Sequence, residues 1–365
     1  MANNAKGNPI TGVAANENYA REVLQLFSLG TNLLYQDGTV QYDANNNPRP
    51  TYTQSDVTEF ARVFTGWTYA PNPGNAVQWN AYVNQNGPMV PYPAMHDFGP
   101  KTLLNGYTSP SGVSPAQDLN NALDNIFNHS NAGPFIGRLL IQHLVKSNPT
   151  TGYSQRAAAA FADNGQGVRG DMKAVVTAIL LDSEARSNDA GNVDGVTDGH
   201  LQEPVITIAG LTRAFGGIMT PENYFGYQVS AIGQEIFNAP SVFNYYSPNF
   251  KAPGALIYGP EFQLHTPNNA IGRSNLIAGM FSAYNNPIQT SGPGYTVDLI
   301  GFMPLATNPA ALVDALDFTL THGTMPAAMK QIVVNAVTND SAGSVSRIQT
   351  GIFLIAGSSY YGVWH

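Results

Sequence analysis

The sequence predicts a mainly α-helical protein with a multi-helix, bundle-like core, long ordered loops and one or more short β-hairpins. Three observations support this fold class. Apolar residues recur at the i, i+3, i+4, i+7 spacing of a helix, these segments begin at capping residues and end near glycines, and alternating strand patterns are sparse. We expect one mainly helical domain over residues 1–365, with a possible subdivision near residues 187–202.

The first predicted helix lies in "AANENYAREVLQLFSLG", residues 14–30. Its apolar face comprises Ala20, Val23, Leu24 and Phe27, and Gly30 ends it. A second helix begins at Thr53 or Ser55, and its expected buried residues are Val57, Phe60, Ala61 and Phe64.

The third predicted helix starts at "SPAQ", residues 114–117, which combines a capping box with proline at the first helical position. Its expected apolar face comprises Leu119, Leu123, Ile126 and Phe127. Further helices are expected over residues 134–146, 153–162 and 170–183. The last has Asp171 near its positive end, as the helix dipole favours.

Residues 38–56 alternate around an Asn/Pro-rich turn, which predicts a β-hairpin between the first two helices. Asp43, Asn45 and Asn47 have the spacing of a calcium loop, but Pro48 and Gln54 replace its glycine and its bidentate glutamate. Residues 69–112 and 240–272 are rich in aromatic residues and proline, which predicts ordered loops. Residues 187–202 are polar and glycine-rich, which predicts a flexible surface segment.

Composition excludes several classes of function. Asp, Glu, Lys and Arg make up only 11% of the chain and its net charge is -8, so a nucleic-acid partner is not expected. The chain has no cysteine, and no apolar stretch reaches the roughly 20 residues of a membrane span. Its richness in Asn, Gly, Tyr and Pro favours an exported protein, periplasmic or extracellular, whose signal is not present in this chain.

No motif in the sequence predicts a metal or a cofactor. H-E-x-x-H, G-x-S-x-G, the P-loop and G-x-G-x-x-G do not occur. His143 falls within a predicted helix, and His200 and His265 fall in polar segments without a spaced partner. We therefore interpret His143 as a structural helix histidine, and the spacing of His200 and His265 does not predict a metal site.

Seven motifs occur in an order that resembles one bacterial family. They are "NENYAREVLQLFSLG", "YTQSDVTEFARVFTGWTY", "HDFGPKTLLNG", "PFIGRLLIQHLVKSNPT", "RGDMKAVVTAILLDSEAR", "QEPVITIAGLTRAFGG" and "APSVFNYYSPNF". Together they resemble Domain of Unknown Function 1800, from about Asn3 to the C-terminal helix. The resemblance implies an exported protein, frequently with a signal and a further helical region before the first motif, which this chain lacks. It also implies a possible partner, because many members are encoded beside a sulfatase-like family.

The charged residues of the first helix admit two interpretations. Glu17, Arg21 and Glu22 lie on one polar arc, and Glu17 and Arg21 could simply pair at the i, i+4 spacing in solvent. Alternatively, Glu17 or Glu22 faces a cleft as a catalytic acid or base, with Arg21 as a substrate-binding cation.

The segment "MHDFGPK", residues 95–101, brings an imidazole, a carboxylate and an ammonium together. His96 is the strongest histidine candidate for proton transfer, and Asp97 is a second candidate carboxylate. Lys101 is a candidate charge clamp for the substrate.

Aromatic residues supply the other candidate substrate contacts. Trp67, Tyr245 and Tyr246 could stack on sugar rings, although aromatic loops also pack on protein cores. The same aromatic-rich segment contains Tyr224, Phe225, Tyr227 and Phe243.

Two hypotheses follow. The first is a secreted or periplasmic hydrolase of a glycan-like polymer, with Glu17, Glu22, Asp97 and Glu203 as candidate acids and His96 as an alternative base. The second is a non-catalytic surface or assembly module that partners a sulfatase-like protein. A hydrolase predicts acids that converge at a pocket, whereas a binding module predicts scattered surface ion pairs and an aromatic patch.

Overall fold

The chain folds into two compact units in a computed structural model that describes residues 4–81, 84–187, 198–219, 229–281 and 295–364. Unit 1 contains Met1–Ile141 and Pro149–Asp182, and unit 2 contains Gln142–Asn148 and Ser183–His365. The predicted mainly α fold with short β-hairpins is confirmed. Residues 188–197, within the expected flexible segment, lie outside the described residues, and the single-domain expectation stays a prediction.

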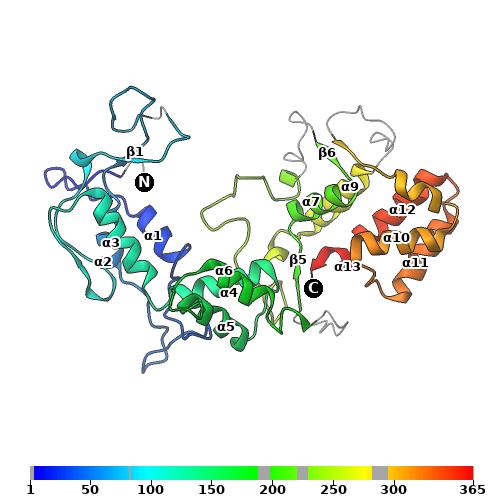
Figure 1. The fold of residues 1–365 in the computed structure, drawn as a ribbon, viewed down its shortest axis with the longest axis horizontal. Helices are drawn as coiled ribbons and strands as arrows, with labels where there is room; N and C mark the ends of the chain where they lie inside the picture. Colours follow the sequence, from blue (N-terminus) through cyan, green and yellow to red (C-terminus); the bar gives the residue numbers. More distant parts are fainter. Residues whose placement is uncertain (1–3, 82–83, 188–197, 220–228, 282–294, 365) are drawn as a thin grey trace. The chain divides into compact units, whose positions relative to one another are not determined.

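Unit 1 takes its helices from the first half of the chain (Figure 1). They are α1 (Asn18–Gln25), α2 (Gln54–Val63), α3 (Pro115–Phe127), α4 (Ala132–Leu144, which ends within unit 2), α5 (Thr151–Ala162) and α6 (Met172–Leu180). The starts follow the predicted caps. Thr53 and Asp56 form a reciprocal capping box on α2, and Ser114 and Asp171 accept backbone N–H groups at the first turns of α3 and α6.

Two predicted apolar faces were partly wrong. Phe27 lies beyond the end of α1 and is 63% exposed. On α3, Leu123 and Phe127 are exposed, and the buried positions include Asp118 and Ala122 instead. The buried face of α3 therefore carries the Asp118 carboxylate, where we expected leucine side chains.

Helices α4 and α5 approach closely because α4 presents glycines to its neighbour. A Cβ at Gly137 would lie 3.3 Å from Cβ of Ala157, and one at Gly133 would lie 3.2 Å from the ring of Phe161. These are tight contacts, so a larger side chain at either glycine would push the helices apart.

The predicted hairpin of residues 38–56 forms as isolated antiparallel bridges rather than continuous strands. Leu34 pairs with Val40, and Tyr42 pairs with Pro48. At its tip, Asp43 Oδ1 accepts the backbone N–H groups of Asn45 and Asn47, at 2.9 and 2.8 Å. The carboxylate thus stabilises the turn itself, in the manner of an Asx turn.

Short strand pairs organise the rest of unit 1. β1 (Trp67–Thr68) pairs with β2 (Val90–Pro91), and β3 (Lys101–Thr102) pairs with β4 (Thr108–Ser109), both antiparallel. The register of the second pair places Lys101 opposite Ser109. Two 3-10 turns, Pro93–Met95 and Leu104–Gly106, lie within residues 69–112, the segment expected to form an ordered loop, of which residues 82 and 83 lie outside the described residues.

Unit 2 is built on helices from the second half of the chain (Figure 1). They are α7 (Pro204–Ala214), α9 (Pro267–Met280), α10 (Pro309–Thr321), α11 (Ala327–Asn339), α12 (Ser344–Ala356) and α13 (Ser359–Gly362), with 3-10 helices η4 (Pro260–Gln263) and η5 (Ile300–Leu305). α10, α11 and α12 pack on one another around fully buried Leu312, Leu316, Val333, Ile348 and Ile352. Truncating one of these leucines or isoleucines to alanine would cost about 2–5 kcal/mol.

Two antiparallel strand pairs join distant parts of unit 2. β6 (Ile218–Met219) pairs with β7 (Tyr295–Thr296), and β5 (His200–Leu201) pairs with β8 (Val363–Trp364) near the C-terminus. Gln202 extends the second contact, because its backbone N–H donates to Gly362 O at 2.8 Å. The segment that leads into α7 is thereby fixed beside β8 and the end of α13, and β5 also contacts η4.

Candidate functional site

Glu17 lies in a polar cluster between α1 and α2. Its carboxylate accepts hydrogen bonds from Arg21 Nη2 at 3.0 Å, Gln54 Nε2 at 2.8 Å and Thr58 Oγ1 at 2.8 Å. The hydrogen bonds from Thr58 and Gln54, together with Arg21, lower the pKa of Glu17. The predicted i, i+4 pair is therefore present, and both oxygens of Glu17 are occupied by protein donors.

Glu22, one turn further along α1, has a different environment. Its Oε2 is buried and has no hydrogen-bond partner among the described residues. Burial raises the pKa of the nearby Tyr52, and the charge of Glu22 adds to this effect.

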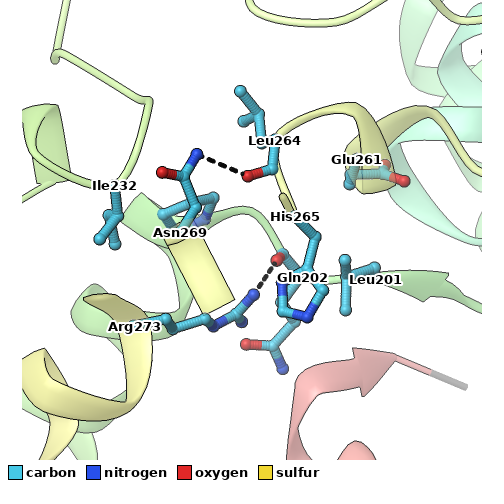
Figure 2. A pocket seen from close by; sticks show the side chains of 9 residues that line it. Leu201, Gln202, Ile232, Glu261, Leu264, His265, Asn269 and Arg273 are labelled. Carbon is cyan, nitrogen blue, oxygen red and sulfur yellow. Dashed lines mark hydrogen bonds between the residues drawn. The ribbon is translucent and has the colours of Figure 1, made fainter. Parts of the chain in front are cut away.

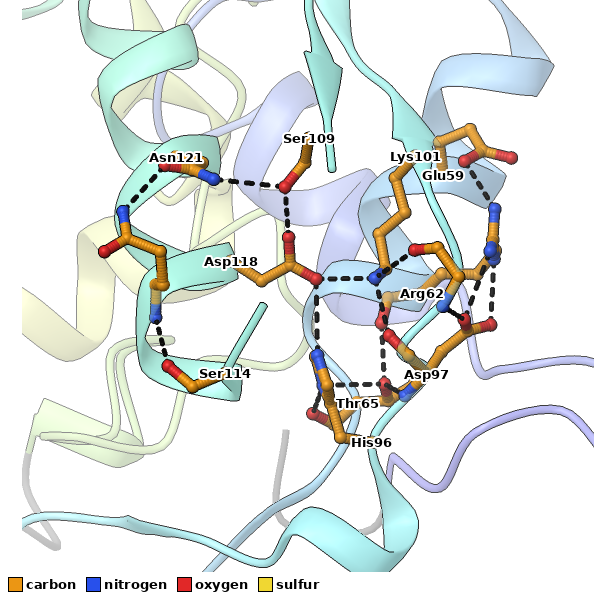
Figure 3. A network of polar contacts seen from close by, with 12 residues as sticks. Glu59, Arg62, Thr65, His96, Asp97, Lys101, Ser109, Ser114, Asp118 and Asn121 are labelled. Carbon is orange, nitrogen blue, oxygen red and sulfur yellow. Dashed lines mark hydrogen bonds and ion pairs between the residues drawn. The ribbon is translucent and has the colours of Figure 1, made fainter. Parts of the chain in front are cut away.

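His96 is fully buried in a polar network between α2 and α3 (Figure 3). Its Nδ1 lies 2.9 Å from the Thr65 carbonyl oxygen, and its Nε2 lies 3.2 Å from Oδ2 of Asp118. Both ring nitrogens thus face oxygen acceptors of the protein.

Lys101 and Asp118 form the centre of this network (Figure 3). Lys101 Nζ donates to Asp118 Oδ2 at 2.5 Å and to the carbonyl oxygens of Asp97 and Gly99 at 2.5 and 3.0 Å, which accounts for all three N–H donors. Burial opposes ionisation of Asp118, but hydrogen bonds from His96, Lys101 and Ser109 hold the pKa of Asp118 below its usual range. The buried ammonium and carboxylate neutralise each other.

Asp97 points toward α2 and not toward the His96 ring. Its carboxylate binds Arg62 in a bidentate pair, at 2.9 Å and 3.1 Å, and accepts the Gly99 N–H at 2.8 Å. Although burial acts in the opposite direction, these hydrogen bonds and the Arg62 charge lower the pKa of Asp97. Arg62 also pairs with Glu59 at 2.7 Å.

Asp118 is a residue that the sequence reasoning missed. Its position on α3 is the signal that could have found it, because Asp118, Ala122 and Ile126 share one face at i, i+4 spacing. A carboxylate on the buried stripe of a helix requires a buried partner.

The predicted residues of unit 1 thus fall into two groups. Glu17 and Arg21 form one group, while His96, Asp97 and Lys101 are brought together by the second network. No contact described in unit 1 joins the two groups. Trp67 lies in β1, and its buried Nε1 has no hydrogen-bond partner within the described residues.

A small cavity lies within unit 2, beside the segment that leads into α7 (Figure 2). Its volume of about 10 Å³ has room for one water molecule. The residues that line it come from β5, α7, η4 and α9 and from the turns beside them: Leu201, Gln202, Pro204, Ile232, Glu261, Leu264, His265, Asn269 and Arg273.

Glu261 is the carboxylate of the cavity wall. It is 2% exposed, and its Oε1 lies 3.1 Å from Nδ1 of His200, which is itself buried against the Trp364 ring. Glu261 Oε2 and His200 Nε2 are buried without a hydrogen-bond partner among the described residues. A buried acid with an unpaired oxygen beside an imidazole is an arrangement that can transfer a proton.

A second carboxylate, Glu203, follows His200 by three residues in the chain. Glu203, the residue before α7, accepts a hydrogen bond from Tyr246 Oη at 2.7 Å and another from Gln234 Nε2. Burial, followed by the negative charges of Glu203 and Glu261, strongly raises the pKa of Tyr246. Tyr246 is therefore a protonated donor, and its hydroxyl is hydrogen-bonded to Glu203.

Two basic side chains border the cavity from α9 and the turn before it. Arg273 Nη1 donates to the Gln202 carbonyl oxygen at 3.1 Å, and Nη2 donates to Thr207 Oγ1. Partial burial and the charge of Arg273 lower the pKa of His265.

The predicted aromatic contacts have separate environments. Tyr246 is buried with its ring 6.3 Å from that of His143, whereas Tyr245 is half-buried and donates its hydroxyl to the Glu235 carbonyl oxygen. Phe243 is exposed. Tyr224, Phe225 and Tyr227 lie outside the described residues.

A family model described as "Protein of unknown function (DUF1800)" matches residues 1–363, almost the whole chain. The chain belongs to the DUF1800 family. No curated protein and no solved structure is similar enough to this DUF1800 chain to match it.

Two further properties of the DUF1800 chain concern membranes and metals. None of the helices in the described ranges is long and apolar enough to cross a bilayer. In the same ranges, no group of three or more His, Asp or Glu side chains is arranged to hold a metal ion.

Proposed function

We propose that this DUF1800 protein is a hydrolase that uses carboxylate and histidine acid–base chemistry at the Glu261–His200 pair of unit 2, beside a cavity with room for one water molecule. The observation that carries the proposal is the buried Oε2 of Glu261, which has no hydrogen-bond partner among the described residues, while His200 is hydrogen-bonded to the other oxygen.

The proposed roles follow from the contacts. Glu261 Oε2 exchanges a proton with the reacting group. His200 holds Glu261 in position through its contact with the other carboxylate oxygen, Oε1. Glu203 is the second carboxylate, which glycoside hydrolysis requires, and Tyr246 holds it by donating to its Oε1. A glycan-like polymer outside the cytoplasm is the substrate class that we propose.

The test is a hydrolysis screen on glycans and on aryl glycosides and esters, with the wild-type chain, Glu261→Gln and Glu235→Gln. Glu235 is a matched control, because it carries the same side chain but bonds locally to Asn238. We expect Glu261→Gln to lower kcat about 10²–10⁴-fold, the usual contribution of general acid–base catalysis, and Glu235→Gln to leave it unchanged. A wild-type rate in Glu261→Gln would contradict the role of Glu261.

The residues first predicted to be catalytic in unit 1 are tested in the same screen. A catalytic role stays a prediction for Glu17, Glu22, His96 and Asp97. The variants Glu22→Gln and His96→Ala test it. If these variants lose kcat while they keep their fold and Glu261→Gln does not, the active site belongs to unit 1.

A second candidate function, a non-catalytic assembly module, is favoured by exposed apolar side chains in residues 237–257. Phe237, Phe243 and Leu256 are 104%, 56% and 90% exposed. Such side chains are typical of surfaces that bind another protein, and a sulfatase-like protein is the partner proposed. Co-purification that is lost in Phe237→Ser, with no hydrolysis in the screen, would support this function over the first.

A further inference from the structure

We propose that Lys101 and Asp118 become covalently cross-linked by an isopeptide bond between Lys101 Nζ and Asp118 Cγ. The cross-link goes beyond the proposed function, since it lies in unit 1 and does not depend on hydrolysis. Its basis is a buried amine against a buried carboxyl group, 17 residues apart in the chain, with the His96 imidazole beside the same carboxyl oxygen (Figure 3).

Burial removes the solvent that normally keeps a lysine and an aspartate charged. Lys101 is 1% exposed and Asp118 is 0% exposed. A low-dielectric environment disfavours charged groups, so transfer of a proton from Nζ to Oδ2, which gives a neutral amine and a neutral acid, costs less here than in water. Burial raises the pKa of Asp118, but its hydrogen bonds lower the pKa below the usual range, so the ion pair is the major state. The neutral pair is the minor, reactive state.

The contacts of Lys101 direct its amine at the carboxyl group. Two N–H groups donate to the carbonyl oxygens of Asp97 and Gly99, at 2.5 and 3.0 Å, and the third donates to Asp118 Oδ2 at 2.5 Å. Transfer of this third proton leaves a lone pair that points toward Asp118. Since a C–O bond is about 1.2 Å long, Nζ lies within about 3.8 Å of Asp118 Cγ, close to the attack distance of about 3–3.5 Å.

The carboxyl group has a donor on one oxygen and an imidazole on the other. Ser109 Oγ donates to Oδ1, where negative charge develops as the amine adds to Cγ, so this hydrogen bond stabilises the tetrahedral intermediate. His96 Nε2 lies 3.2 Å from Oδ2 and has no other partner among the described residues. His96 Nδ1 carries its proton toward the Thr65 carbonyl oxygen, at 2.9 Å, so Nε2 of the neutral ring accepts and returns a proton at Oδ2.

The reaction is a condensation that needs no oxidant, reductant or co-reactant. The Nζ–Cγ bond forms and the Cγ–Oδ2 bond breaks. Two protons pass from Nζ to Oδ2, the first directly along the Lys101–Asp118 hydrogen bond and the second through His96. Oδ2 leaves as water, and the ammonium and the carboxylate become one neutral amide. Because the reacting groups are held together within one folded chain, even a minor neutral state is enough for the stable amide to accumulate.

The amide would tie β3 to α3. The chain has no cysteine, so no disulfide can connect its elements. A cross-link between two residues constrains the unfolded chain, which favours the folded state. Since the amide is uncharged, stability that depends on the Lys101–Asp118 ion pair belongs to the chain before the bond forms.

A second short ion pair, in unit 2, shows what distinguishes this site. Lys330 Nζ lies 2.6 Å from the buried Asp317 carboxylate, but the Lys330 side chain is 31% exposed. Hydrogen bonds to Asp317 and Asp314 raise the pKa of Lys330, which keeps it an ammonium. The described partners of Asp317 are Lys330, Thr321 and the Met325 N–H, and none of these is an imidazole. We expect this pair to stay unlinked.

The experiment is mass spectrometry of the intact chain and of its proteolytic peptides. The wild type and its variants are made by cell-free synthesis, and the folded chains are followed until their masses are constant. We expect the wild type to lose the mass of one water molecule and to yield one branched peptide that joins Lys101 to Asp118. Lys101→Arg should keep its full mass, whereas the control Lys330→Arg should lose water as the wild type does.

Two further variants test the assigned proton transfer and charge stabilisation. His96→Gln and Ser109→Ala should form the bond at least about tenfold more slowly than the wild type. Circular dichroism confirms that each variant is folded. Because neither substitution removes the amine or the carboxyl group, a slower rate in a folded variant reports on the reaction itself.

A folded wild-type chain that keeps its full mass would overturn the inference. Water loss that persists in Lys101→Arg, or that maps to an unbranched peptide, would also overturn it, because cyclisation of an aspartate with its own backbone releases water too. A wild-type rate in folded His96→Gln and folded Ser109→Ala would overturn the roles of these two side chains.

Discussion

Removing the Asp118 carboxylate should destabilise unit 1 strongly. Asp118 is fully buried, and its Oδ2 lies 2.5 Å from Lys101 Nζ and 3.2 Å from His96 Nε2. In Asp118→Ala, the Lys101 ammonium would stay buried with only carbonyl oxygens as partners. Loss of one member of a buried ion pair costs about 3–5 kcal/mol, because the other charge is left uncompensated.

A double-mutant cycle separates this charge effect from lost packing. Asp118→Leu combined with Lys101→Met removes both charges, so the double variant should cost at least about 2 kcal/mol less than the sum of the two single variants. Asp314→Ala is the control, since it removes a carboxylate from the more exposed pair with Lys330 and should cost less than about 1 kcal/mol.

The assay is urea unfolding, combined with hydrogen exchange of peptides from residues 97–127, so that unit 1 is followed separately from unit 2. We expect the free energy of opening to fall in Asp118→Ala and to recover partly in the double variant. A cost below about 1 kcal/mol for Asp118→Ala, or strict additivity in the cycle, would refute the view that the two buried charges depend on each other.

Three other changes should also affect stability. Gly66→Ala should cost about 2–4 kcal/mol in urea unfolding, because φ is +76° and the new Cβ would lie 2.8 Å from His96 Cβ, whereas Gly74→Ala meets open space and should cost less. Since the folded-state pKa of Asp118 is lowered, its contribution is present above the ordinary Asp pKa of about 3.9 and is lost as pH falls through the lower folded value. Acid titration should therefore show a smaller loss of stability in folded Asp118→Asn, and an identical acid profile would contradict this. Thr53→Ala should cost about 1 kcal/mol through loss of the capping box on α2, and an unchanged urea midpoint would argue against it.

Local chemistry made the helix starts predictable. Thr53, Ser114 and Asp171 accept hydrogen bonds from backbone N–H groups within the next three residues, so their role depends on a few neighbours in the chain. The Asx turn at Asp43 is equally local. Phe27 was predicted to be buried from periodicity alone, but the helix ends before it, at Gln25.

The candidate sites could not be predicted from neighbouring residues in this way. His200 and Glu261 are 61 residues apart and meet because β5 pairs with β8 and η4 packs beside them. In the sequence, His200 had no spaced partner, since regular spacing reveals only pairs within one element.

The sequence by itself determined the helical fold class, the capped helix starts and membership of the DUF1800 family. These depend on periodicity, local hydrogen bonds and residue order. Only the tertiary structure decided that Asp118 neutralises Lys101, that Glu261 has a buried unpaired oxygen, and that Arg273 has no described counter-charge. The physical reason is that burial and electrostatic pairing are properties of side chains brought together across long stretches of chain, which local patterns do not specify.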